Sequence, residues 1–363
     1  MSSTARNIVS ISTVDDIVGA VQAAAAASQT LTAARCAPES ACQLDLSTLN
    51  TLIDYPARDM TVTVESGMTL QALGDLLKTE GQHLPVDVGD PDMSVGAFVA
   101  SDLAGSRQYG YGTLRDYLIG MEAVDGQGRV FHAGGRVVKN VAGYDLCRLM
   151  IGSRGALGIL SQLTFKLKPI PERSIIQRWK FSEPAAVAMS LERLNTSVTR
   201  PVVIDLETCG QSSWSLFVGV EGPSAVCEWQ IERLHEEITD ATESDTLADS
   251  ETSVIEYCRT AAARHIADST ACIIKALPSK VVDMCRMVHE AGGIAHCHAG
   301  NGIIMVSTAN QKALSEQAIQ QLRDPLKENS GYLIVPPTSA SFPQASSCTR
   351  GLIDAFDPSH VFV

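Results

Sequence analysis

The order of hydrophobic and polar positions in the first third of the chain predicts two helices with recognisable caps. Thr13 is the expected N-cap of the first, because Asp16 completes a capping box three residues later, and the alanine-rich run 20–28 continues the helix. Thr69 is the expected N-cap of the second, which should end near Gly81. The apolar face of this second helix should consist of Leu70, Leu73, Leu76 and Leu77.

Short runs rich in β-branched and aromatic residues predict strands around and beyond these helices. Residues 30–34 form a short strand candidate, and Met60–Glu65 alternates like a strand that is buried on one face. Further strands are predicted at Tyr117–Val124, Val130–Ala133 and Ile159–Leu167, and a short helix at Leu146–Ile151.

After Pro169-Ile-Pro171 the pattern becomes a strand–helix–strand–strand–helix unit that is roughly repeated, so we place a domain boundary there. The first unit has strands at 175–181, 201–207 and 215–220 and helices at 183–194 and 225–238. The second has strands at 271–277 and 332–336, a hairpin at 293–307 and helices at 280–291 and 311–323. Between the units, the acidic and polar segment Asp240–Ser253 is predicted to be a surface loop.

Composition excludes several classes of partner and site. A chain of 363 residues is expected to form two domains, and its net charge of −13 argues against nucleic acid or an anionic membrane as a partner. We see no apolar run near the roughly 20 residues of a membrane span and no secretory signal. The ten cysteines form no CxxC motif, so we expect no metal or iron–sulfur site and a reducing environment.

Glycine is concentrated in the middle of the chain. Fifteen of the 27 glycines lie between Gly81 and Gly158, alternating with the short β-prone runs. This pattern is compatible with loops whose main chain packs against a flat ligand, since glycine allows close approach. An ordinary glycine-rich β-domain with bulges and tight turns is an equally good explanation from composition alone.

A set of motifs in this region resembles a known family. The motifs are Pro85, Ser94-Val-Gly-Ala97, Gly105, Tyr109-Gly110, Leu114-Arg-Asp116, Gly120, Lys139-Asn140, Gly143-Tyr144-Asp145 and Gly152-Ser153 with Gly155-Ala-Leu-Gly-Ile159. Their order and spacing resemble the FAD-binding domain of the vanillyl-alcohol-oxidase superfamily, and within it the FAD-binding subunits of bacterial glycolate oxidases. The resemblance is dense over residues 44–170 and thin but compatible elsewhere.

The resemblance implies an α+β fold in three parts. Residues 1–170 would form a two-subdomain FAD-binding domain of the PCMH type, and residues 171–336 a ferredoxin-like α+β cap domain. Residues 337–363, with the motif Leu352–Pro358, would form a terminal helix that returns to the FAD-binding domain.

The resemblance also implies FAD as the cofactor and a set of residues that would bind it. These are Arg35, Pro85, Asp90, Ser94, Val95, Gly96, Ser101, Gly105, Ser106, Tyr109, Gly110, Leu114, Asp116, Gly158 and Ile159. Lys139, Asn140, Tyr144 and His298 are candidates for the side of the flavin ring or substrate. Lys139 is suited to stabilise negative charge on reduced flavin or on a carboxylate, although an exposed lysine paired with Asp145 explains it equally well. Tyr144 is expected to be a buried anchor rather than an acid or base.

One segment departs from the family. Relatives carry a cluster of glycines whose N–H groups hold the FAD pyrophosphate, whereas this chain has no glycine from Ala20 to Ser66. In its place stands Ala33–Cys42, where Pro38 lacks a donor and Glu39 would repel a phosphate. Arg35 offsets part of that repulsion as a phosphate partner.

The segment His296-Cys-His-Ala-Gly-Asn-Gly302 is the one constellation in the cap that fits chemistry. His296 and His298 are two residues apart, so both lie on one face of a strand, as a metal or substrate site would require. A β-hairpin whose Asn301-Gly302 forms the turn is the favoured explanation, and we predict no metal.

Three functions follow from these observations. The first is an FAD-binding accessory or electron-transfer subunit of a glycolate oxidase complex, beside a homologous catalytic FAD subunit and an iron–sulfur subunit, with a small 2-hydroxy acid as the substrate oxidised. The second is a flavin-free scaffold subunit of the same complex. An independent NAD-dependent dehydrogenase is disfavoured, because no strand–GxGxxG–helix is present. The expected location is cytoplasmic, or peripheral to the inner membrane through the partners, and no residue here is a credible general base.

Overall fold

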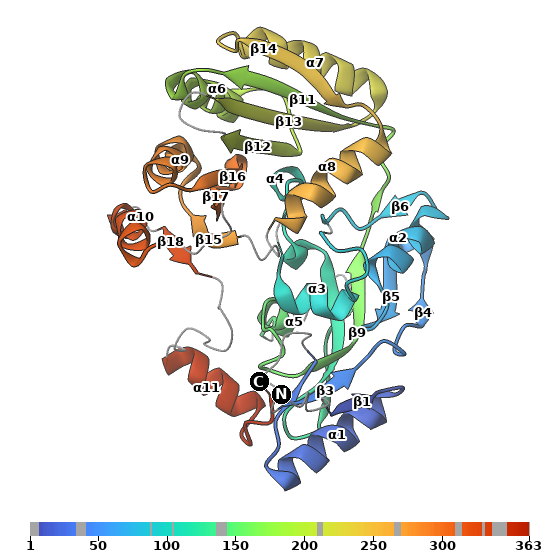
Figure 1. The fold of residues 1–363 in the computed structure, drawn as a ribbon. Coiled ribbons are helices and arrows are strands. Elements are labelled where there is room, and N and C mark those ends of the chain that lie inside the picture. The colour runs from blue at the N-terminus through green and yellow to red at the C-terminus, as the bar shows by residue number, and fades with distance from the viewer. Residues whose placement is uncertain are drawn as a thin grey trace.

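The computed structural model describes residues 7–33, 41–87, 89–103, 105–135, 144–208, 213–264, 270–308, 314–328, 331–335 and 347–362. In Figure 1 the N-terminal elements, blue to green, lie beside and below a large sheet built by the later part of the chain. We call residues 7–169 the N-terminal half and the large sheet the cap sheet. Within the described ranges, no helix combines the length and the apolar character that crossing a bilayer requires.

A small parallel sheet opens the chain. Its order is β1-β3-β2, with β1 at Ile8–Ser10, β3 at Cys42–Asp45 and β2 at Leu31–Thr32. Helix α1 (Val14–Ala27) packs on it through the buried side chains of Ile17, Val21 and Ala24. The predicted capping box is confirmed, since the Asp16 amide donates to the Thr13 hydroxyl and the Asp16 carboxylate accepts from the Thr13 amide.

A second, antiparallel sheet carries most of the glycine-rich region. Its order is β4-β5-β9-β7-β8, with β4 at Leu52–Asp54, β5 at Thr61–Glu65, β9 at Ile159–Lys166, β7 at Leu118–Val124 and β8 at Val130–Gly134. Helices α2 (Leu70–Lys78), α3 (Val95–Ser101) and α5 (Leu146–Met150) contribute to its core. The expectation that β5 is buried on one face only is wrong, because four of its five residues are buried. It is an inner strand, paired with β4 and β9.

The cap sheet is a single antiparallel sheet of two repeated units. The first unit consists of β11 (Arg173–Phe181), α6 (Pro184–Thr196), β12 (Val203–Thr208), β13 (Trp214–Gly222), α7 (Ser224–Glu237) and β14 (Glu243–Ala248). The second consists of β15 (Thr270–Lys275), α9 (Val281–Glu290), β16 (Ile294–His298), β17 (Ile303–Ser307), α10 (Glu316–Glu328) and β18 (Tyr332–Ile334). The strand order β14-β11-β13-β12-β16-β17-β15-β18 places two split β-α-β units edge to edge, joined at β12 and β16.

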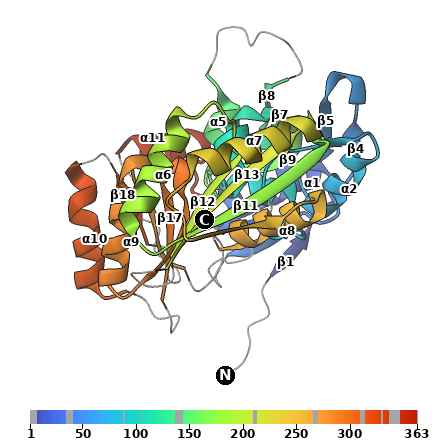
Figure 2. The ribbon, with the colours of Figure 1, turned by 90° about the horizontal axis from the view of Figure 1, so that it is seen from above.

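Each unit is ferredoxin-like, and the predicted α+β fold class is confirmed. Helices α6, α7, α9 and α10 pack on one face of the cap sheet, and Figure 2 shows α6 and α7 lying across β11 and β13. The opposite face is covered by α8 (Glu251–Ala263), which packs on β11, and by the N-terminal half, which contacts β12 through α4 (Gln108–Tyr111).

The acidic segment between the units is not the predicted loop. It contains β14 and the first turn of α8 (Glu251–Ala263), a helix that the hydrophobic pattern did not reveal. The charged residues of β14 stabilise an edge strand, because Asp245 pairs with Arg178 and Glu243 pairs with Lys180 across β11. The acidic composition of this segment led to the wrong prediction that it contains neither strand nor helix.

The C-terminal segment returns to the N-terminal half. Helix α11 (Ser347–Phe356) places Phe356 against Phe131, and the Phe356 carbonyl accepts a hydrogen bond from the Gly126 amide at 2.9 Å. Phe362 then bridges to Leu31 of β2. A short pair formed by β6 (Gln82–His83) and β10 (Lys168–Pro169) marks the exit to the cap sheet.

Cysteine burial leads to a first prediction. Among the described cysteines, Cys348 is exposed and the others are buried. Burial raises the pKa of Cys272 to about 12 and that of Cys147 to about 11, so both are thiols at neutral pH. In a short pulse of iodoacetamide on the folded protein, we expect peptide mapping to find Cys348 alkylated and these two unmodified until denaturant is added. Labelling of Cys272 at the rate of Cys348 would show that the cap core is open.

Candidate functional site

The N-terminal half and the cap sheet meet at the loop that precedes α4. Gly105 begins this loop, and a Cβ atom at that position would lie 2.3 Å from the Asp87 Cβ, so only glycine fits. At the other end of α4, the Gly110 amide donates to the Val202 carbonyl at 3.2 Å. Tyr109 packs against the turn after β16, where a Cβ atom at Gly300 would lie 2.3 Å from the Tyr109 ring.

Asp205 is the buried polar centre of this contact. It stands on β12, is 3% exposed, and accepts hydrogen bonds from three different elements. Its Oδ2 accepts from the Ser106 hydroxyl at 2.5 Å and from the Tyr257 hydroxyl at 3.0 Å. Its Oδ1 lies 2.8 Å from the His298 Nδ1 on the paired strand β16. A buried carboxylate is stable only when such donors replace its water, and here they do.

A second buried carboxylate, that of Asp87, binds Arg107, the residue that follows Ser106 in the same loop. The Asp87 side chain accepts from the Arg107 amide at 2.7 Å and from the Arg107 Nε at 2.6 Å. Arg107 is 7% exposed, and its Nη1 also lies 3.7 Å from Glu221 of β13. The Glu221 carboxylate in turn accepts from the Tyr111 hydroxyl at 2.6 Å. Burial acts to lower the pKa of Arg107, but the Asp87 and Glu221 carboxylates outweigh it and the pKa is raised.

The carboxylate of Glu207 is a further charged group on the cap sheet, and it is partly accessible to solvent. Glu207 lies on the same face of β12 as Asp205, and the register pairs it with His296 of β16. The Glu207 carboxylate lies 3.7 Å from the His296 Nδ1 and 2.5 Å from the Arg264 Nη1. Burial acts to raise the pKa of Glu207, but His296 and Arg264 outweigh it, so the pKa is lowered. This face therefore presents ionised and hydrogen-bonding groups toward the N-terminal half.

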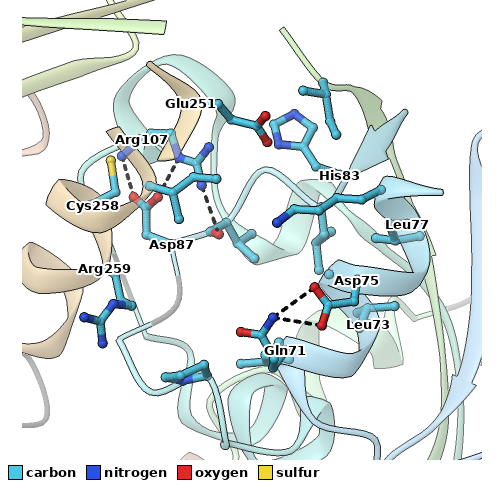
Figure 3. Close-up of a pocket in the computed structure, with 18 residues that line it drawn as sticks. Gln71, Leu73, Asp75, Leu77, His83, Asp87, Arg107, Glu251, Cys258 and Arg259 are labelled. Atoms are coloured by element: carbon cyan, nitrogen blue, oxygen red, sulfur yellow. Dashed lines mark hydrogen bonds and ion pairs between the residues drawn. The ribbon is translucent and has the colours of Figure 1, made fainter. Parts of the chain in front are cut away.

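A cavity of about 170 Å³ adjoins Arg107 between α2 and α8. Figure 3 shows Asp87 and Arg107 on one wall with Cys258 beside them, and His83 and Glu251 at the top. Burial, followed by the charges of Arg107 and Lys168, lowers the pKa of His83 to about 3. The described residues of the predicted cofactor set do not line this cavity, so it is distinct from the predicted cofactor site.

The predicted cofactor residues at the start of α3 form a compact turn. Ser94 is the N-cap and accepts from the Ala97 amide at 3.2 Å. The Val95 amide donates to the Met68 carbonyl at 2.9 Å and the Gly96 amide to the Ser66 carbonyl at 2.8 Å. These two N–H groups are thus used by the chain itself and not by a ligand.

The neighbouring candidates also have internal roles. The Asp90 side chain accepts from the Asp92 amide at 3.0 Å, and the Ser101 hydroxyl donates to the Ala97 carbonyl at 2.7 Å. Pro85 is buried.

The remaining candidates lie in several places. Leu114 is a core residue, and Asp116 caps its own turn by accepting from the Thr113 amide at 2.8 Å. Gly158 and Ile159 are buried where β9 begins, and a Cβ atom at Gly158 would lie 2.7 Å from the Val124 carbonyl oxygen. The close approaches of these glycines are thus explained by the protein's own atoms. The structure brings together Ser106, Tyr109, Gly110 and His298 at the contact with the cap sheet.

Some candidates cannot be placed. Arg35, Lys139 and Asn140 lie outside the described residues. Tyr144 is 95% exposed, so the expectation that it is a buried anchor is wrong. It directly precedes Asp145, which caps the short helix α5 by accepting from the Arg148 amide at 3.1 Å, so the tyrosine lies outside that helix.

Two buried hydroxyl groups beside α3 fit a polar ligand. The Ser66 Oγ and the Ser153 Oγ are out of contact with solvent and have no hydrogen-bond partner in the part of the chain that is described. Ser66 lies at the start of α3, where its carbonyl binds Gly96, and Ser153 follows Gly152, whose amide binds Val99 near the end of α3. Leaving such a group unpaired costs about 1–3 kcal/mol, so a ligand rich in hydrogen-bonding atoms would be favoured there.

The hairpin predicted at residues 293–307 is confirmed, but its turn is longer than the predicted Asn301-Gly302. β16 and β17 pair antiparallel through a 3₁₀ turn at Ala299–Asn301, and Gly302 follows with φ +70°. Within the described ranges, no group of three or more His, Cys, Asp or Glu side chains is arranged to hold a metal ion.

Sequence reasoning missed several residues of this contact, namely Arg107, Asp205, Glu207, Tyr257 and Glu221. The available signals were weak. Asp205 and Glu207 alternate with apolar residues in a strand-like run, which is also the pattern of a solvent-exposed face. Arg107 follows directly after the motif residues Gly105 and Ser106, and its partner Asp87 is 20 residues away.

The N-terminal part of the chain is similar to known proteins. Residues 5–134 match the family model described as FAD binding domain. The chain is 34% identical over 172 residues to the mitochondrial D-lactate dehydrogenase [cytochrome] of Arabidopsis thaliana, covering 47% of this chain and 30% of that protein. It is 35% identical over 148 residues to glycolate oxidase subunit GlcE of Escherichia coli, covering 40% of this chain and 42% of that protein.

The similarity extends over part of each relative. D-2-hydroxyglutarate dehydrogenase of Xanthomonas citri is 37% identical over 132 residues, which is 36% of this chain and 28% of that protein. The chain thus spans about a third of the length of the curated relatives it matches. A solved structure of alkyldihydroxyacetonephosphate synthase has the same fold, with a TM-score of 0.71 and 15% identity over 98% of this chain and 75% of that one.

Proposed function

We propose that this chain is a flavin-dependent subunit acting in the oxidation of a small 2-hydroxy acid, because it is similar to FAD-binding proteins that include a glycolate oxidase subunit and D-lactate dehydrogenases. The observation that carries the proposal is the match of residues 5–134 to an FAD-binding domain together with relatives that share one chemistry. D-lactate, glycolate and D-2-hydroxyglutarate, which appear in the names of those relatives, are all 2-hydroxy acids.

The cofactor would lie against α3, where the donor set fits it. Ser66 and Ser153 would offer hydroxyl donors to the dinucleotide, and Arg35, from the sequence resemblance, would offer positive charge to its pyrophosphate. When bound, a flavin supplies a two-electron acceptor for the hydride that leaves C2 of a hydroxy acid. The chain itself would orient the substrate and exclude water at the contact between the N-terminal half and the cap sheet.

The substrate would meet the polar face of β12 and β16. Arg264 carries positive charge suited to a carboxylate, although Glu207 shares it. His298 is held at its Nδ1 by Asp205 and is buried at this contact. Lys139, Asn140 and Tyr144 remain proposed neighbours of the flavin ring.

We further propose that a homologous catalytic FAD subunit and an iron–sulfur subunit are partners, from the resemblance to glycolate oxidase subunits. We also propose that the complex is cytoplasmic or peripheral to the inner membrane.

A flavin-free scaffold in the same complex is the second candidate. The observation that favours it is that the Val95 and Gly96 amides at the start of α3 are bound by the Met68 and Ser66 carbonyls. Together with the glycine-free segment Ala33–Cys42, this would leave a pyrophosphate with few main-chain donors in the region where relatives supply them.

A thermal-shift measurement distinguishes the two functions. We expect FAD at 100 times its Kd to add about 2.7 kcal/mol to the free energy of unfolding and to raise Tm, because a ligand that binds only the folded state stabilises it by mass action. FMN, which lacks the adenosine half, should give a smaller shift at equal concentration. No shift with saturating FAD, in a preparation without flavin absorbance, would favour the scaffold.

A matched variant tests the position of the cofactor. Ser66→Ala removes an unpaired buried hydroxyl, so it should leave the stability of the free protein unchanged or raise it, and should reduce the shift that FAD produces. An unchanged FAD shift would mean that the cofactor does not reach Ser66.

A further inference from the structure

We propose that Asp205 is a positioning residue that fixes the tautomer and orientation of His298 and couples both to the contact between the two halves of the chain. As an assignment of a role in catalysis, this inference rests on the proposed function. The arrangement of hydrogen bonds that it describes is testable without turnover.

The geometry assigns the proton between the two side chains. The Asp205 Oδ1 lies 2.8 Å from the His298 Nδ1, and an ionised carboxylate is an acceptor only, so Nδ1 carries the hydrogen. A neutral imidazole with a hydrogen on Nδ1 has its acceptor lone pair on Nε2. Asp205 therefore determines which ring nitrogen of His298 is able to take up a proton.

The other oxygen of Asp205, Oδ2, lies at the contact between the N-terminal half and the cap sheet. The Oδ2 accepts from Ser106 in the N-terminal half and from Tyr257 on α8. The Tyr257 hydroxyl keeps its proton, because burial and then the charge of Asp205 raise its pKa well above the ordinary value. One carboxylate thus receives hydrogen bonds from the N-terminal half, from α8 and from β16. A shift of the cap sheet relative to the N-terminal half would disturb His298 through Asp205.

A purely packing role would not distinguish aspartate from asparagine of the same shape. In Asp205→Asn, the amide oxygen is still able to accept from Ser106 and Tyr257, but the amide nitrogen that faces His298 is a donor. His298 must then accept at Nδ1 and carry its hydrogen on Nε2. The variant therefore keeps the volume of the side chain and reverses the tautomer.

Nuclear magnetic resonance spectroscopy measures the tautomer of His298 directly. In protein labelled with ¹⁵N-histidine, two-bond ¹H–¹⁵N correlations report the protonation of each ring nitrogen, and His298→Asn identifies the His298 signals by their loss. We expect the Nδ1–H tautomer at neutral pH in the unsubstituted chain and the Nε2–H tautomer in Asp205→Asn. An imidazolium or an Nε2–H ring in the unsubstituted chain, or the same tautomer in both proteins, overturns the assignment.

Kinetics tests whether the tautomer matters for catalysis. With FAD, a dye acceptor and glycolate or D-lactate, in the purified complex, Asp205→Asn should lower kcat by about 10²–10⁴-fold and change KM little, as expected when a histidine is held in the wrong tautomer. The pH profile of kcat should also change. Tyr257→Phe removes one hydrogen bond to Asp205 without touching the His298 contact, so it should lower Tm, retain the tautomer and lower kcat much less than Asp205→Asn does.

The two failures are distinguishable. If the unsubstituted complex turns over no 2-hydroxy acid, the proposed function fails, and the magnetic-resonance result alone decides the role of Asp205 in setting the tautomer. If it turns over and Asp205→Asn retains kcat, the proposed function stands and the positioning role is overturned. Equal losses of kcat in Asp205→Asn and Tyr257→Phe would indicate a general structural effect and would likewise overturn it.

Discussion

Asp87→Ala is expected to lower the free energy of unfolding by about 3–5 kcal/mol, because it leaves the buried guanidinium of Arg107 without its main partner. The Asp87 side chain is fully buried and accepts two hydrogen bonds from Arg107, one from the main chain and one from Nε. Glu221 lies 3.7 Å from Arg107 and is already bound to Tyr111, so it offsets only part of the loss. Urea denaturation at neutral pH measures the change.

Two further variants separate the charge effect from a general loss of packing. In Asp87→Ala with Arg107→Met, both charges are absent, and the double variant should be more stable than Asp87→Ala alone. Glu236→Ala breaks the exposed pair with Arg233 and should change stability very little. If Asp87→Ala destabilises no more than Glu236→Ala, the Arg107 site is hydrated and the buried pair contributes little to the stability of the fold.

Elements specified by local chemistry were predictable from the sequence. Three features act within a few residues, so the neighbouring sequence is sufficient to predict them. They are the capping box of Thr13 and Asp16, the N-cap Thr69 and the turn glycine Gly302. The repeated strand–helix units of the cap were also predictable, because their apolar positions follow the periods of helix and strand.

What the sequence concealed depends on partners that are far apart in the chain. Asp205 forms hydrogen bonds with Ser106, 99 residues away, and with His298, 93 residues away. The periodic pattern of apolar residues indicates local structure only, so it does not predict such contacts. α8 was missed because the acidic residues at its start resemble a solvent-exposed loop. The face that it buries becomes apparent only in the folded chain, where the helix packs on β11. The glycine-rich region was interpreted as a surface for a flat ligand, yet Gly105 approaches Asp87 of the protein itself.

Acid is expected to weaken the fold through His83. Burial and two nearby positive charges lower its pKa to about 3 from the ordinary 6.5, so between these values the unfolded chain binds a proton that the folded chain does not. Stability must therefore fall as the pH is lowered from 6.5 toward 3, by at most about 1.4 kcal/mol per pH unit. Above pH 6.5 the histidine is neutral in both states and contributes nothing to the pH dependence.

The variant His83→Gln isolates this contribution, because glutamine keeps a polar side chain beside the cavity and does not titrate. Between pH 6.5 and about 4.5, the unsubstituted protein should lose up to about 3 kcal/mol more than His83→Gln, measured by urea denaturation at each pH. Lys168→Gln removes one of the two charges and should reduce the difference only slightly, since burial is the largest cause of the lowered pKa. Parallel stability curves for the unsubstituted protein and His83→Gln would mean that His83 is protonated in the folded state. The wall of the cavity between α2 and α8 would then be open to water, and the contact of α8 with the N-terminal half would be looser than its buried side chains indicate.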